Sequence, residues 1–427
     1  MTRASQMTGL APVRHILANG VVSIVQETSF SPAVTISAAV RAGSVTEPPS
    51  QPGLAAFLGR VLDRGTKHLS TDVIAEALDD RGVVLRVSTN RHTQTISCTC
   101  LAEDFADMLS LVAAIVREPA FPAEEIEKRR AETITAIRQD LDNPGVRASE
   151  ALQSLLYGAD HPYGRPAKGS IESVERFTRE DLLAMYIGSF APALTTVAIV
   201  GDVDAAAAID QVSQAFGAWQ HAARAETLLP PPPAARERRE IRIDMPDKSQ
   251  CDIAYGFVTI DRFDPAYYAY WAMNNVLGQF GLGGRLAENI RERQGMAYYA
   301  FSAFDPSLGP GPLVIRAGVD PRNVERAIES IDAEVSALGK DGPTEREMSE
   351  TRQYLIGSIP RLLETNHSIA AFLLSAEFFG LGLDYDRRLP EYLERVTIEQ
   401  VHDAAAAVLH PERAALAVAG PNAGATA

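Results

Sequence analysis

Apolar residues near the start of the chain recur at helical spacing. In residues 53–66, GLAAFLGRVLDRGT, they follow the i, i+3, i+4 rule and predict an amphipathic helix with one buried stripe. The other side of that helix would carry Ala56, Gly59 and Arg60, and the same spacing gathers these three in one compact patch. Glycine costs about 1 kcal/mol relative to alanine inside a helix, so helix propensity does not explain Gly59.

Two distant segments of the chain repeat one pattern. Residues 174–201 align without a gap with residues 393–420. Each copy reads as a helix capped by threonine, Thr178 or Thr397, then a turn containing proline and a β-rich strand that ends in glycine. Shorter matches occur elsewhere in the same order, so the pattern predicts a duplicated domain.

A proline-rich segment separates the two copies. Residues 221–240 contain four consecutive prolines flanked by charged residues, which is typical of a stiff, extended linker. We therefore expect an N-terminal domain at 1–222, a linker at 223–240 and a C-terminal domain at 241–427. Strand and helix patterns do not alternate strictly within each half, so we expect an α+β fold with a mainly antiparallel sheet flanked by helices in each domain.

Composition and charge exclude several classes of function. The chain of 427 residues is 46% hydrophobic and 22% charged, as folded globular proteins are. Its formal net charge of -15 lacks the basic footprint that nucleic acid or an anionic membrane requires. No apolar run reaches the roughly 18 residues that span a bilayer, and no secretory signal is recognisable. We expect no nucleic-acid partner, no membrane and a cytoplasmic location.

Common catalytic motifs are absent from the sequence. It contains no H-E-x-x-H or H-x-x-E-H zinc motif, no G-x-S-x-G nucleophile elbow and no G-x-x-x-x-G-K phosphate loop. The eight histidines are scattered, and no two are spaced to share a helical face. The sequence therefore does not predict a complete active site on this chain.

The most informative remaining segment is residues 278–304, GQFGLGGRLAENIRERQGMAYYAFSAF. A helix is predicted after its glycines, Gly295 is placed to cap the C-terminus of that helix, and a strand begins near Tyr298. Arg291 would lie in the last helical turn, close enough to Tyr298 for the two side chains to act as a pair. The glycines leave the backbone free for positive φ and for close approach of another chain segment; they are Gly278, Gly281, Gly283 and Gly284.

Arg291 and Tyr298 have two interpretations. A guanidinium and a phenol together can donate hydrogen bonds to a peptide carbonyl or to a developing oxyanion. Alternatively, Arg291 only offsets the helix dipole and Tyr298 only lies at a sheet edge. The spacing alone does not decide between them.

A series of short motifs occurs in one order between residues 14 and 420. They are RAGS (41–44), EPP (47–49), GLA-x-FL (53–58), GT (65–66), DNP (142–144), HPYGRP (161–166) and GGRLAENIRERQGMAY (283–298). In this order they resemble the pitrilysin, insulin-degrading enzyme and mitochondrial processing peptidase family of zinc peptidases, especially bacterial members with two repeats. The resemblance implies two homologous domains that form a half clamshell.

The resemblance also places the family's zinc motif, H-x-x-E-H with a later glutamate, on this chain. The first histidine falls on Ala56, the glutamate base on Gly59, the second histidine on Arg60 and the distal glutamate on Ala136. Zinc hydrolysis needs imidazole or carboxylate ligands and a carboxylate base, and none of these four residues offers them. We therefore expect no metal and no cofactor in this chain.

Further positions follow from the same resemblance. Arg86 and Val87 replace the Asn and Ala of the family's N-A-x-T signature on the substrate-binding edge strand, which argues against substrate pairing there. The Arg and Tyr by which the family's C-terminal domain holds the substrate backbone map onto Arg291 and Tyr298. In relatives with such a split pattern, a zinc-bearing chain that lacks this pair joins a zinc-less chain that has it.

These implications favour a non-catalytic subunit of a heterodimeric zinc metalloendopeptidase. A homologous partner with H-x-x-E-H would supply the zinc, the glutamate base and an edge strand that pairs with an unfolded peptide by β-augmentation. This chain would supply Arg291 and Tyr298. Two alternatives stay open: a structural subunit, like the relatives that are core proteins of a respiratory complex, and a homodimeric peptide-binding module.

The first hypothesis predicts the metal content of the isolated chain. Because the motif positions offer no ligands, the purified chain should hold no stoichiometric zinc and hydrolyse no peptide. Activity should arise on mixing with an H-x-x-E-H partner. Elemental analysis and a peptidase assay of each chain and of the mixture check this, and stoichiometric zinc in the isolated chain would contradict the hypothesis.

Overall fold

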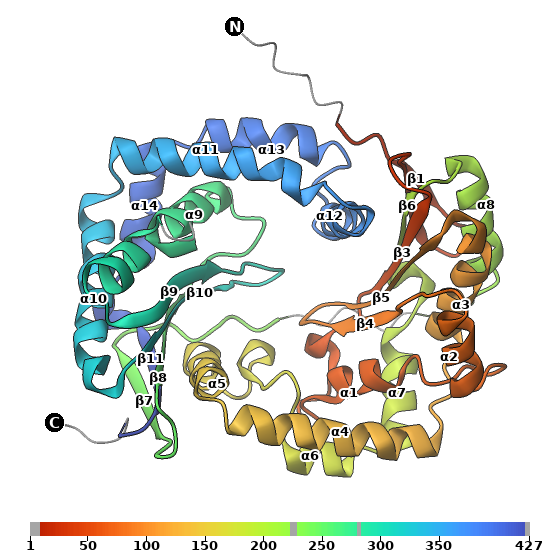
Figure 1. Cartoon of the computed structure of the whole chain (residues 1–427), viewed down its shortest axis with the longest axis horizontal. Coiled ribbons are helices and arrows are strands. Elements are labelled where there is room, and N and C mark those ends of the chain that lie inside the picture. Colours follow the sequence, from red (N-terminus) through yellow and green to blue (C-terminus); the bar gives the residue numbers. More distant parts are fainter. Residues whose placement is uncertain (1–8, 223–228, 280–282, 423–427) are drawn as a thin grey trace, which may run out of the picture. The chain divides into compact units, whose positions relative to one another are not determined.

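The chain forms two compact units, seen in a computed structural model that describes residues 9–222, 229–279 and 283–422 (Figure 1). Each unit combines three stretches of the chain. The first unit takes its residues from Met1–Thr135, Pro166–Leu228 and Ile359–Arg388, and the second from Ala136–Arg165, Leu229–Ser358 and Leu389–Ala427.

A six-stranded sheet organises the first unit, in the order β1-β2-β6-β3-β5-β4. Every neighbouring pair of these described strands is antiparallel except β2 and β6. The strands are β1 (Val13–Ile16), β2 (Val22–Glu27), β3 (Ala33–Val40), β4 (Arg86–Thr89), β5 (Gln94–Leu101) and β6 (Thr195–Gly201). The helices are α1 (Leu54–Val61), α2 (Thr71–Asp79), α3 (Phe105–Arg117), α6 (Ile171–Arg176), α7 (Arg179–Ser189), α8 (Ala205–Phe216) and α12 (Asn366–Phe378).

A five-stranded sheet organises the second unit, in the order β7-β11-β8-β10-β9. Its strands are β7 (Arg239–Asp244), β8 (Cys251–Val258), β9 (Ala297–Phe304), β10 (Pro312–Val319) and β11 (Ala415–Gly420). The helices are α5 (Pro144–Tyr157), α9 (Tyr267–Asn274), α10 (Val324–Asp341) and α14 (Ile398–Val408), with short π-helical segments η5 (Asn275–Gln279) and η6 (Ala287–Arg293). Three helices belong partly to one unit and partly to the other; they are α4 (Ala123–Leu141), α11 (Glu345–Leu362) and α13 (Tyr385–Glu394).

The two sheets share one topology, as a duplicated domain requires. When β1 is left out, the strands of the first sheet follow one another in the same order as those of the second, β2-β6-β3-β5-β4 against β7-β11-β8-β10-β9. Each sheet has one parallel pair, β2 with β6 and β7 with β11. Strand β6 therefore corresponds to β11, and β4 to β9. The helices that precede β6 and β11 begin alike, because Thr178 and Thr397 each form a reciprocal capping box. The threonine-capped helices predicted in the repeat are therefore present.

Strand β8 is buried on both faces, and its two faces carry different residues. Ile253, Tyr255 and Phe257 belong to the core that α9, α10 and α14 share. On the other face, a Cβ built on Gly256 would lie 3.3 Å from Leu152 and 3.6 Å from Leu156 of α5. Successive residues of a strand point to opposite faces, so the small residues of β8 leave room for α5, which lies beside β8 and β11 in Figure 1.

Helix α12 covers the first sheet in the corresponding way. Its Ile369, Ala370 and Leu373 pack in one cluster with Ile24 of β2 and with β6. At its N-terminal end the Asn366 amide donates to the carbonyl of Ala33 (3.0 Å) and accepts from the Thr28 hydroxyl (2.9 Å). Since α5 comes from the first half of the sequence and α12 from the second, each repeat supplies a helix to the other repeat's sheet.

The α+β fold with two sheets flanked by helices is confirmed, and mostly antiparallel pairing with it. Residues 229–238 of the expected linker form neither helix nor strand, and β7 begins at Arg239. The boundaries 1–222, 223–240 and 241–427 stay a prediction about the sequence repeat. In the part of the chain that the structure describes, no helix is both long and apolar enough to cross a membrane.

The contact between α5 and β8 predicts a large effect of one core substitution. Leu152 is fully buried, so Leu152→Ala should lower the free energy of unfolding by about 2–5 kcal/mol. Leu141→Ala is the matched control, because Leu141 is 43% exposed and should change stability by less than about 1 kcal/mol. Denaturant unfolding of both variants measures this, and equal effects would contradict the packing of α5 on the sheet.

Candidate functional site

Helix α1 has the predicted buried stripe. Leu54, Phe57 and Leu58 are at most 1% exposed. The helix begins after Gly53, whose φ of 89° lies in the left-handed region. The Glu47 carboxylate accepts from the backbone N–H groups of Gly53 (3.0 Å) and Ala55 (2.8 Å), where the helix dipole favours a negative charge.

Gly59 faces a space that a neighbouring side chain fills. A Cβ atom built on Gly59 would overlap Oγ1 of Thr89, which ends β4, and would lie 3.4 Å from Oε1 of Gln94 on β5. Gln94 is fully buried and donates through Nε2 to the carbonyls of Ala42 and Ala55. A glutamate at Gly59 would therefore need Thr89 to move.

Arg60 points to the surface of the same unit. Its guanidinium lies 3.5 Å from the Glu132 carboxylate, and the two side chains are 43% and 40% exposed. Glu132 also accepts a 2.6 Å hydrogen bond from Arg129, so this part of α4 is occupied by ion pairs. Ala136 is half-buried on the same helix and carries only a methyl group.

These residues do not fit a zinc ion. The sequence resemblance aligns the four motif positions with Ala56, Gly59, Arg60 and Ala136, and none of these side chains is a metal ligand. Among the described residues, no group of three or more His, Cys, Asp or Glu side chains is arranged to hold a metal ion. No step of hydrolysis can be assigned to the α1 face.

Strand β4 lies at an edge of the first sheet and carries Arg86 and Val87. Arg86 is exposed and Val87 is half-buried. Strand β4 is therefore an edge strand. Its Arg86 and Val87 are the residues that stand where the resembling family has Asn and Ala.

Two of the predicted glycines are required by close packing. A Cβ on Gly278 would lie 2.8 Å from the Ser302 nitrogen, and one on Gly284 would lie 2.7 Å from Cα of Gly278. The segment that approaches these glycines belongs to the same chain. Gly283 is exposed, and Gly281 lies outside the described residues.

Gly295 ends the helical segment η6 as the sequence indicates. Its φ is +62°, and its N–H donates to the carbonyl of Arg291 at 3.1 Å, as in a left-handed helix cap. The Arg291 side chain is 44% exposed, and its Nε lies 3.3 Å from the carboxylate of the adjacent Glu292. Arg291 and Tyr298 thus stand on either side of one tight turn.

Tyr298 is the extra residue of a β-bulge on β9. Tyr299 pairs with Gly318 of β10 and Ala297 with Val319, so Tyr298 has no opposite residue. Its side chain is 73% exposed. A bulge redirects a side chain at a strand edge, and β9 is the edge strand of the second sheet.

The neighbouring Tyr299 has a different role. Its hydroxyl donates to the buried carboxylate of Asp252, and Gln250 donates to the other oxygen of that carboxylate at 3.1 Å. Burial raises the pKa of Tyr299, and the hydrogen bond to Asp252 raises it further. The sequence pattern YY did not distinguish the buried tyrosine from the exposed one, because the bulge breaks the alternation of the strand.

The two sheets share one topology, and the residues that the sequence resemblance aligns with the family's zinc motif are not zinc ligands. Two family models match the sequence: Insulinase (Peptidase family M16) over residues 22–165 and Peptidase M16 inactive domain over residues 176–355. The chain belongs to the M16 (insulinase) peptidase family.

Relatives match nearly the full length of the chain. It is 28% identical over 425 residues to an uncharacterized zinc protease of Mycobacterium tuberculosis, covering 98% of this chain and 95% of that one. It is 24% identical over 386 residues to the non-peptidase homolog YmxG of Helicobacter pylori, covering 89% and 87%. A solved structure of a peptidase M16 inactive domain from Pseudomonas fluorescens has a TM-score of 0.89 and 25% identity, covering 96% and 98%.

The overlap at Gly59 predicts that Gly59 and Thr89 are energetically coupled. Alanine favours a helix over glycine by up to about 1 kcal/mol, but the new methyl group in Gly59→Ala would displace Thr89. The substitution should therefore raise the free energy of unfolding only when it is combined with Thr89→Ala. A double-mutant cycle by denaturant unfolding should give a coupling energy of about 1 kcal/mol.

Gly357→Ala in α11 is the matched control for this cycle. A Cβ there meets nothing within 4 Å, so its effect should be the same with Thr89 or Ala at position 89. Additive effects of Gly59→Ala and Thr89→Ala would show that Thr89 does not restrict the α1 face.

Proposed function

We propose that this chain is the non-catalytic subunit of a heterodimeric zinc metalloendopeptidase, and that it binds the peptide substrate through Arg291 and Tyr298. A homologous partner subunit with an intact H-x-x-E-H motif would carry the zinc and the glutamate base. The peptide would be an unfolded segment, because backbone recognition needs its N–H and C=O groups free.

The position of Tyr298 carries the proposal. An aromatic side chain that is 73% exposed, at a bulge of an edge strand, is not explained by packing. Within the described residues β9 pairs with β10 alone, so the outer edge of β9 is available to another chain. This arrangement suits a residue that meets an extended peptide.

Arg291 differs from a structural arginine in the same unit. Arg285 is 16% exposed, bonds both oxygens of Glu347 at 2.7 and 2.9 Å, and donates to the Gly342 carbonyl. Arg291 instead has an exposed ion pair with the neighbouring Glu292, and such surface pairs contribute little. Its guanidinium therefore keeps donors for a ligand.

The chemistry of the pair fits amide hydrolysis in a shared site. The carbonyl oxygen of the cleaved peptide gains negative charge when the activated water attacks. A phenol donates one hydrogen bond and a guanidinium up to five, and neither group accepts the proton that the base must take. The pair would orient the peptide and stabilise the charge, while the partner performs the proton transfer.

Substitution in the reconstituted heterodimer tests this function. Arg291→Ala and Tyr298→Phe should each lower kcat/KM by about 100-fold, because each removes a donor to the developing charge. Neither should change the native mass of the complex, since both side chains are exposed. Steady-state kinetics with a quenched peptide and native mass spectrometry measure the two effects.

Arg293→Ala is the control, because Arg293 is 69% exposed on the same segment and pairs only with Glu288 in the part of the chain described. It should leave kcat/KM unchanged. Unaltered turnover in Arg291→Ala and Tyr298→Phe would instead favour the structural-subunit hypothesis. A homodimer of this chain that binds peptide without a partner would favour the binding-module hypothesis.

A further inference from the structure

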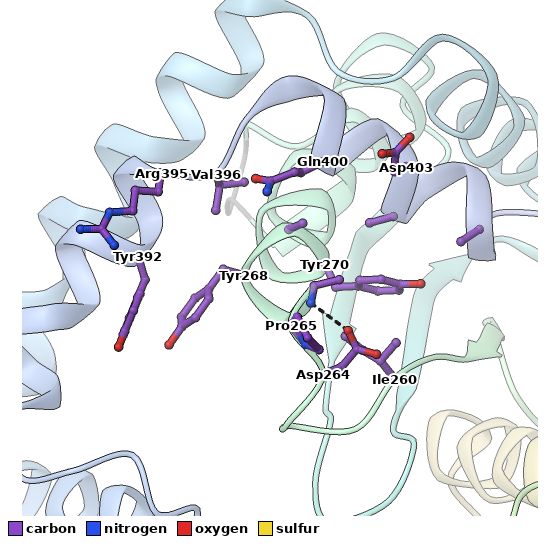
Figure 2. A pocket seen from close by; sticks show the side chains of 14 residues that line it. Ile260, Asp264, Pro265, Tyr268, Tyr270, Tyr392, Arg395, Val396, Gln400 and Asp403 are labelled. Atoms are coloured by element: carbon purple, nitrogen blue, oxygen red, sulfur yellow. Dashed lines mark hydrogen bonds between the residues drawn. The ribbon is translucent and has the colours of Figure 1, made fainter.

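A pocket of about 550 Å³ opens in the second unit, beside the start of α9 (Figure 2). Its walls come from the segment between β8 and α9, from α9 itself, from the end of α13 and the residues that follow it, and from α14. Pockets of this size hold small ligands or a side chain of a bound peptide. None of its lining residues belongs to the α1 face or to the pair Arg291 and Tyr298.

Three polar groups of the pocket are hydrogen-bond acceptors. The Asp264 carboxylate accepts from the Ala266 N–H at 2.8 Å, which fixes its orientation and leaves further acceptor capacity. Asp403, on the exposed side of α14, lines the pocket and has no ion pair or hydrogen bond among the described residues. The third is the hydroxyl of Tyr270, and Figure 2 shows Asp403 and Tyr270 on one side of the pocket.

Tyr270 adds a hydroxyl group at a fixed position in the pocket wall. The residue is only 7% exposed, and within the described chain its hydroxyl has no hydrogen-bond partner. Its ring stacks on Phe304 with centroids 5.9 Å apart, so the side chain is held in place. Burial raises the pKa of Tyr270, with a further contribution from the Asp264 carboxylate, so the phenol stays neutral. The Tyr270 hydroxyl oxygen is not among the described side-chain atoms that are fully buried without a partner, so it reaches the open part of the pocket, where water or a ligand can bond it.

The remaining walls are apolar or aromatic. Ile260, Pro265 and Val396 offer aliphatic surface. Tyr268 and Tyr392 stack on each other with centroids 5.0 Å apart and an interplanar angle of 23°. Aliphatic surface binds a hydrocarbon stem. The Tyr268 ring already attracts a cation of this chain, the Arg262 guanidinium, which lies 5.8 Å from its centroid.

The two carboxylates disfavour an anion in their part of the pocket, and they are too few for a metal site. No cluster of three His, Cys, Asp or Glu side chains that could bind a metal occurs in the described residues. An ammonium or guanidinium group satisfies carboxylate acceptors through directed N–H bonds and needs only two or three of them. We propose that this pocket binds an alkylguanidinium or alkylammonium group, with its charge at Asp264, Asp403 and Tyr270 and its stem along the apolar wall.

Arg395 sets the preferred net charge of the ligand. The residue lines the pocket, its side chain is 75% exposed and its guanidinium lies 3.5 Å from the Glu391 carboxylate. In Figure 2 it stands beside Tyr392, on the other side of the pocket from Asp403. A second positive charge on the ligand would approach Arg395, so a monocation should bind better than a dication.

This site is independent of the proposed peptidase role. It adjoins Phe304 at the C-terminal end of β9, whereas Tyr298 lies near the N-terminal end of that strand. The guanidinium or ammonium could come from a free amine or from an arginine or lysine side chain of a peptide. Both sources present the same cationic group, but only a peptide would also contact the protein through its backbone.

Calorimetry on the full chain tests the proposal with four probes: n-butylguanidinium, 1,4-diaminobutane, an acetylated and amidated Gly-Gly-Arg-Gly-Gly peptide, and its citrulline analogue. Butylguanidinium and the arginine peptide should bind at one site per chain, and the diamine and the citrulline peptide at least about tenfold more weakly. Tighter binding of the peptide identifies a peptide source, and equal binding identifies a free amine.

Variants locate the site. Asp403→Asn and Asp264→Asn should each weaken butylguanidinium binding about tenfold, and Tyr270→Phe about fivefold. The amide of Asp264→Asn still accepts from the Ala266 N–H, so the segment should keep its fold. Glu394→Gln removes the same charge at an exposed position of α13 that does not line the pocket, and should not change binding. Absence of binding by both guanidinium probes, or equal loss in Glu394→Gln, overturns the proposal.

Discussion

The reciprocal exchange of α5 and α12 is the packing on which both units depend. Each helix covers one face of a sheet that belongs to the other repeat. The strands beneath them carry small or polar residues on that face, such as Gly256 on β8 and Ser37 on β3, so the helices bring the large side chains. Because β3 and β8 are buried on both faces, neither repeat completes its core from its own sequence.

Ordinary packing and ion pairs occupy the α1 positions that the sequence resemblance aligns with the zinc motif. Thr89 occupies the space next to Gly59, and Glu132 is engaged with Arg60 and Arg129. Protein interiors are close-packed, so a neighbouring side chain fills the space beside a glycine. The α1 face is therefore part of the first unit's ordinary packing, and α1 has a buried stripe and N-terminal contacts with Glu47.

The two equivalent edge strands have diverged. Strand β4 and strand β9 occupy the same place in the shared topology. At β4 the last residue, Thr89, closes on Gly59, whereas at β9 a bulge turns Tyr298 outward and Tyr299 is held by Asp252. One sheet edge is thus integrated into its unit, and the other presents an aromatic side chain and the neighbouring Arg291.

The sequence by itself determined the duplication, the fold class, the stripe of α1, the capping boxes at Thr178 and Thr397, and the absence of ligating side chains at Ala56, Gly59, Arg60 and Ala136. These follow from local periodicity, cap chemistry and residue identity, which need no knowledge of distant contacts. Only the tertiary structure decided that α5 and α12 each pack on the sheet of the other repeat. It also decided that Thr89 fills the space at Gly59, and that Asp264, Tyr270 and Asp403 line one pocket. These features join residues far apart in the chain, and pairwise packing of that kind leaves no periodic signal in a single sequence.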